Sequence, residues 1–66
     1  MSLRYSVRDC LVALLREQGM SEAAVQSTAD AKLDAAVTRA TQHIQHVRDL
    51  DGWERAAEDL RGWLHE

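Results

Sequence analysis

The sequence predicts an all-α fold of three helices in the order short, long, short, within one domain that covers residues 1–66. Two observations predict this fold. Apolar residues recur every three or four positions in three separate stretches, which is the spacing of one face of a helix. Residues that end or begin helices separate the stretches, namely Gly19, Ser21 and Asp51. No stretch alternates apolar and polar residues in the way of a half-buried strand.

The first predicted helix covers about residues 6–18. Ser6 followed by Asp9 resembles a capping arrangement, although residues 3–5 could extend the helix toward the N-terminus. Gly19 favours the left-handed conformation that ends many helices. The apolar face of this helix comprises Val7, Cys10, Leu11, Leu14 and Leu15.

The second predicted helix covers about residues 21–50, because this segment contains neither glycine nor proline. Ser21 is a good N-cap, and Glu22 suits the positive end of the helix. An uninterrupted helix of this length would span about 45 Å at 1.5 Å per residue. Its apolar face comprises Val25, Ala29, Leu33, Ala36 or Val37, Ala40, Ile44 and Val47.

The third predicted helix covers about residues 52–65. Asp51 is the expected N-cap, with Glu54 three residues later. Gly62 lies off the apolar face and weakens the last turn by up to about 1 kcal/mol. The apolar face comprises Trp53, Ala56, Ala57, Leu60, Trp63 and Leu64.

The unequal lengths of the predicted helices favour self-association. The first and third helices would each be roughly 20 Å long, less than half the length of the second. Either the two short helices pack on opposite halves of the long one, as an elongated monomer with a thin core, or the long helices of two copies pair. We favour the second arrangement and expect a homodimeric helical bundle. Alanines on several sides of the second helix would let helices approach closely. The residues expected at the dimer or partner interface are Leu33, Val37, Ala40, Ile44, Val47 and Trp63.

The composition excludes several classes of protein. Cys10 is the only cysteine, so no disulfide can form within the chain, and a lone cysteine favours a cytoplasmic location. No apolar run approaches the roughly 20 residues of a membrane span. The net charge is −3, and acidic and basic residues are interspersed, which argues against a general nucleic-acid binder. We therefore expect no membrane partner.

No motif predicts catalysis or a cofactor, and we expect a protein that is not an enzyme. Nucleophile elbows, phosphate-binding glycine loops and clusters of metal-binding cysteines are all missing from the sequence. His43, His46 and Asp49 have a spacing that could bring them near one metal, but on a helix they would turn away from a common point. Exposed carboxylates such as Glu58 have an arginine nearby, here Arg61.

These observations favour a small protein that acts by binding protein: itself, as a homodimer, and a further unidentified partner. Such an adaptor or inhibitor would resemble small regulatory proteins of phages and plasmids. The alternative is a small dimeric DNA-binding regulator, because the Gly19–Val25 segment resembles the turn of a helix-turn-helix. The residues exposed at the start of the second helix oppose that alternative, since Glu22, Gln26 and Asp30 offer no cation to phosphates.

Overall fold

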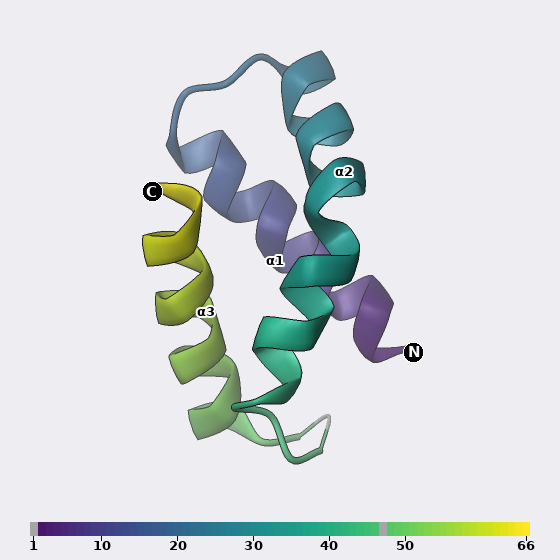
Figure 1. The fold of residues 1–66 in the computed structure, drawn as a ribbon, viewed down its shortest axis with the longest axis vertical. Helices are drawn as coiled ribbons and strands as arrows, with labels where there is room; N and C mark the ends of the chain where they lie inside the picture. Colours follow the sequence, from purple (N-terminus) through teal and green to yellow (C-terminus); the bar gives the residue numbers. More distant parts are fainter. Residues whose placement is uncertain (1, 47) are drawn as a thin grey trace.

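The computed structural model describes residues 2–46 and 48–66. In these ranges the chain forms three α-helices and no strand: α1 (Leu3–Glu17), α2 (Glu22–Thr41) and α3 (Leu50–Leu64). α2 and α3 lie side by side and run in opposite directions, and α1 crosses behind α2 (Figure 1). The molecule measures 32 × 23 × 17 Å along its principal axes. The predicted all-α fold of three helices is confirmed.

The first helix begins earlier than the capping pattern at Ser6 indicates. Ser2 is the N-cap of α1, and its hydroxyl accepts a hydrogen bond from the backbone amide of Tyr5 at 3.2 Å. Leu3 then belongs to the helix and packs against the core. The turn between α1 and α2 agrees with the prediction, because Gly19 has a φ of 80° and Ser21 caps α2.

The prediction of one helix over residues 21–50 is wrong, because α2 ends at Thr41. A turn follows, and the Asp49 carboxylate organises it. One oxygen of Asp49 accepts from the amide of Gln45 at 3.1 Å, and the other accepts from the amide of Gly52 at 3.0 Å. These hydrogen bonds lower the pKa of Asp49. The N-cap of α3 is therefore Asp49 and not Asp51, because only the earlier aspartate reaches the free amides.

Gly52 makes this turn possible. A Cβ at this buried position would lie 2.7 Å from the carbonyl oxygen of His43 and 2.7 Å from Cγ of Asp49. Both distances are too short for any side chain, so only glycine lets the turn pack against the first turn of α3. The turn is thus encoded by an aspartate and a glycine near its end, and not by a glycine or proline within it.

One chain covers the apolar face of α2. The helices contain 15, 20 and 15 residues, so their lengths are far closer than the sequence indicated. Homodimer formation therefore no longer follows from an excess of helix length. The buried core draws on all three helices and on the turn after α2, and it comprises Val7, Leu11, Val12, Leu14, Leu15, Val25, Ala29, Leu33, Ala36, Ala40, Ile44, Ala56 and Leu60.

Candidate protein-binding face

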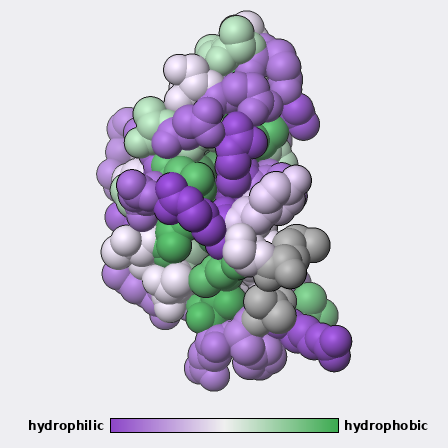
Figure 2. Space-filling model, turned by 90° about the vertical axis from the view of Figure 1, so that its right-hand side faces the viewer, coloured by the Kyte–Doolittle hydropathy of each residue, from purple (hydrophilic) through white to green (hydrophobic). Residues whose placement is uncertain are grey.

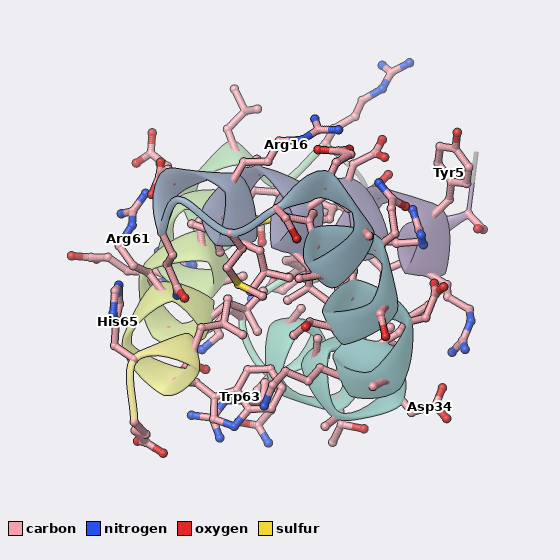
Figure 3. The ribbon with its side chains drawn as sticks, turned by 90° about the horizontal axis from the view of Figure 1, so that it is seen from above. Tyr5, Arg16, Asp34, Arg61, Trp63 and His65 are labelled. Carbon is pink, nitrogen blue, oxygen red and sulfur yellow. The ribbon has the colours of Figure 1, made fainter. Side chains whose placement is uncertain are left out.

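The most distinctive surface of the molecule surrounds Trp63. This half-buried side chain of α3 lies against α2, on the side of the molecule away from α1 (Figure 3). The Nζ of Lys32 lies 5.0 Å from the centroid of the Trp63 ring, and Cζ of Arg39 lies 5.4 Å from it. Both are within the range of cation–π attraction. Ala35 is exposed between the two cations, three residues after one and four before the other, so it shares their side of α2.

Arg39 connects Trp63 to a polar cluster between α2 and α3. Its Nη2 donates to Oδ1 of Asp59 at 2.8 Å, and the other oxygen of Asp59 lies 3.1 Å from Nε2 of His43. The hydrogen bond from Arg39, with a smaller effect of His43, lowers the pKa of Asp59. The Nε of Arg39 is buried and has no hydrogen-bond partner. A buried unpaired donor is uncommon, and because the fold covers this nitrogen, an acceptor outside the chain does not reach it in this conformation.

Lys32 also differs from most other cations of the chain. Arg4, Arg8, Arg16 and Arg61 each form an ion pair with a carboxylate of another helix. Among the described residues, no carboxylate lies within ion-pair distance of the Lys32 ammonium group, which lies over the Trp63 ring. Arg61, which the sequence pairs with Glu58, instead donates to Glu17 of α1 at 3.4 Å. The positive charge at Lys32 is therefore available to an external group.

Gly62 leaves a gap in the outer surface of α3 beside Trp63. It is exposed, and a Cβ built on it would have no atom within 4 Å. Glycine inside a helix is about 1 kcal/mol less favourable than alanine. No described neighbour requires glycine at this position, and the absent side chain leaves the backbone of α3 accessible there.

We name these five residues the Trp63 face: Lys32, Ala35, Arg39, Gly62 and Trp63. Of these five residues, only Trp63 is predicted from the sequence as a contact with another chain or partner. The signals that could have found the others are the seven-residue spacing of Lys32 and Arg39, which places them on one side of a helix, and the position of Gly62 off the apolar face.

The other predicted interface residues occupy different places. Leu33, Ala40 and Ile44 lie in the core of the single chain, with at most 8% of their surface exposed. They cannot form the centre of a contact with another molecule while the chain keeps this fold. Val37 is partly buried and packs against the same core. Val47 lies outside the described residues.

The start of α2 carries carboxylates that pair with arginines of α1. The exposed Glu22 accepts a hydrogen bond from Nε of Arg16 at 3.1 Å, so that cation is already neutralised. Arg8 of α1 is likewise held by Asp30 at 3.0 Å and by Gln26 at 2.7 Å. The Gly19 turn thus has the geometry that the sequence predicts, but the helix that follows it carries carboxylates where phosphates would lie.

The side chains of Cys10, His43 and Asp49 are partly buried or hydrogen-bonded within the fold. Burial raises the pKa of the Cys10 thiol, which disfavours the nucleophilic thiolate. His43 is engaged with Asp59, and the carboxylate of Asp49 binds backbone amides. In residues 2–46 and 48–66 no group of three His, Cys, Asp or Glu side chains could hold a metal ion, and no pocket is found.

Large exposed hydrophobic side chains are scattered over the described surface. Tyr5 is 61% exposed at the start of α1 and points away from the molecule (Figure 3), and Leu50 is 75% exposed at the start of α3. Figure 2 shows one side of the molecule on which polar side chains cover most of the surface and apolar atoms fill small gaps. In the described part of the chain, no helix has the length and apolarity needed to cross a membrane.

No model of a known protein family matches this chain, and no curated protein or solved structure matches it either. Its function is therefore inferred from the surface described above.

Proposed function

We propose that this chain is a protein-binding module of the adaptor or inhibitor type, which contacts its partner through the Trp63 face. The observation that carries the proposal is a half-buried tryptophan under two cations, of which Lys32 forms no ion pair among the described residues. Tryptophan and arginine dominate the residues that contribute most to protein–protein binding. A cytoplasmic site of action is part of the proposal, because the lone Cys10 thiol suits a reducing compartment.

The shape of the surface supports a macromolecular partner. Ligands of drug size bind in concave sites of several hundred Å³, and the described residues form no such pocket. The Trp63 face lies on the side of the molecule away from α1 (Figure 3). A helical face without a pocket is suited to contact with another protein surface.

A photo-crosslinking amino acid at position 62 tests the proposal in the native cell. Gly62 is exposed, so the probe is tolerated and points outward from the face. The matched control carries the same probe at Ala13, which is exposed on α1, on the other side of the molecule. We expect protein adducts from position 62, identified by mass spectrometry, and none of these adducts from position 13. Equal adducts from both positions, or none from position 62, would contradict the proposal.

Binding of duplex DNA provides the test of the alternative function. A helix-turn-helix protein binds DNA at 50 mM salt and loses affinity steeply as salt increases. We expect no binding, because the arginines near the start of α2 are paired with carboxylates of the chain. Salt-dependent binding that Gln26→Glu abolishes would instead support a DNA-binding regulator.

A further inference from the structure

We infer that α3 is a lid, which opens as a unit while α1 and α2 remain packed together. The Trp63 face is divided between the lid and the rest of the chain, because Lys32, Ala35 and Arg39 lie on α2 whereas Gly62 and Trp63 lie on α3. The face therefore exists only when α3 is docked. The opening is a property of the free chain, and only its consequence for binding rests on the proposed function.

The packing of the helices allows α3 to leave without separating the other two. The most extensive contact joins α1 to α2, whereas α3 lies mainly against α2 and touches α1 at few places (Figure 1). The side chains that α3 buries completely are those of Ala56 and Leu60, and Trp53, Trp63 and Leu64 remain partly exposed. α1 and α2 each bury five residues: Val7, Leu11, Val12, Leu14 and Leu15 in α1, and Val25, Ala29, Leu33, Ala36 and Ala40 in α2.

The ion pairs are divided in the same way. Three of them join α1 to α2. Among the described residues, the ion pairs between α3 and the α2 side of the molecule all use one carboxylate, Asp59, which contacts Arg39 and His43. The ion pair between α3 and α1 joins Arg61 to Glu17 at 3.4 Å, and both side chains are about half exposed, so its contribution is small.

The closed state contains two unfavourable features at the contact between α2 and α3. The Nε of Arg39 is buried without a hydrogen-bond partner, which costs free energy because this donor has lost its water. Arg39 and Lys32 also lie over the same Trp63 ring, so two like charges are held near each other. Opening of α3 returns water to both cations, which lowers the free energy needed to open it.

The lid links binding to closure. A partner that contacts both helices of the Trp63 face binds the closed form and not the open one. Such a partner therefore holds α3 closed by mass action. Conversely, the fraction of chains that are open reduces the apparent affinity for that partner.

Hydrogen exchange of the free chain, followed by NMR at increasing urea concentrations, tests the inference. The backbone amides of Ala56 and Leu60 should exchange at least about tenfold faster than those of Leu11 and Leu33. Their exchange should also depend less on urea, because opening of one helix exposes less surface than global unfolding does. If these four amides exchange at the same rate with the same urea dependence, α3 separates only when the whole chain unfolds, and the inference is overturned.

Arg8→Met provides a variant that separates the two kinds of opening. The hydrogen-bond partners of Arg8 are Asp30 and Gln26, which both lie on α2, so this contact persists when α3 alone opens. We expect the amides of α1 and α2 to exchange at least about threefold faster in this variant, and those of α3 to change by less than about twofold. Equal acceleration in all three helices would overturn the inference.

Asp59→Asn is the matched variant, because its contacts with Arg39 and His43 are lost in both kinds of opening. It should accelerate exchange in all three helices by the same factor. The failure of the lid can be distinguished from the failure of the proposed function, since the exchange experiment contains no partner. If α3 opens as described but position 62 gives no crosslinked protein, the lid stands and the protein-binding face is wrong.

Discussion

Alanine substitutions at two glycines of the same helix should have opposite effects on stability. Gly52 and Gly62 both lie in α3, and alanine is about 1 kcal/mol more favourable than glycine in a helix interior. The structure adds a steric conflict at Gly52 and none at Gly62. A Cβ at Gly62 meets no atom within 4 Å, whereas a Cβ at Gly52 would lie 2.7 Å from the carbonyl oxygen of His43.

The expected magnitude at Gly52 combines three contributions. The Asp49 carboxylate must move away from the new Cβ, and loss of an N-cap costs about 0.5–2 kcal/mol. The His43 carbonyl belongs to the backbone and cannot swing aside, so overpacking adds about 1–3 kcal/mol. The helix propensity of alanine returns about 1 kcal/mol. We expect Gly52→Ala to lower the free energy of unfolding by about 2 kcal/mol.

Urea denaturation followed by circular dichroism and tryptophan fluorescence measures both variants. It is done at low protein concentration, so that association does not contribute to the free energy of unfolding. Gly62→Ala should be as stable as the wild type or more stable, by up to about 1 kcal/mol. If Gly52→Ala is stabilised like Gly62→Ala, the turn is not packed against α3 as described, and the explanation for the end of α2 is wrong.

Three further predictions concern side chains elsewhere in the fold. Arg39 lowers the pKa of Asp59, so the ionised carboxylate stabilises the fold above its unfolded pKa of about 4. This contribution is lost as pH falls through the lower folded pKa. The urea midpoint should therefore fall more steeply below about pH 4 in the wild type than in Asp59→Asn. Ser21→Ala removes the N-cap of α2 and should cost about 1 kcal/mol by urea denaturation, whereas Ser27→Ala on the exposed side of the helix should be neutral. Cys10 should react with a disulfide reagent at pH 8 at least about tenfold more slowly in the folded chain than in urea, and equal rates would show that its thiol is not held in the core.

Periodicity of apolar residues was sufficient to predict the helical class, because each helix has one face in a common core. The positions predicted for the apolar face of the second helix agree with the buried residues Val25, Ala29, Leu33, Ala36 and Ala40. The turn signals at residues 19 and 21 were also local, since a left-handed glycine and a serine cap act within a few residues of their own position.

The end of α2 could not be predicted in the same way, because its cause lies several residues further along the chain. The segment after Thr41 has no residue that breaks a helix by itself. This segment leaves the helix because the Asp49 carboxylate accepts from the amides of Gln45 and Gly52, which lie before and after it in the chain. Gly52 also leaves room for the His43 carbonyl. Reading the turn requires three-dimensional contacts that helix propensity and spacing do not contain.

The candidate face was only partly predictable for a related reason. Trp63 stands out by its residue type, but the importance of Lys32 depends on which other cations are paired, and that pairing joins residues of different helices. The buried Nε of Arg39 is likewise a property of packing. The helix-length argument put Leu33, Ala40 and Ile44 at an interface, whereas the structure buries them in the core of one chain. The overestimated length of the second helix made these core residues look like an excess of apolar surface.

Photo-crosslinking in the native cell from a probe at position 62 tests the central claim most directly, because it reports which protein lies against the Trp63 face. The account predicts protein adducts from position 62 that the same probe at Ala13 does not give. Equal adducts from both positions, or no adduct from position 62, would contradict it.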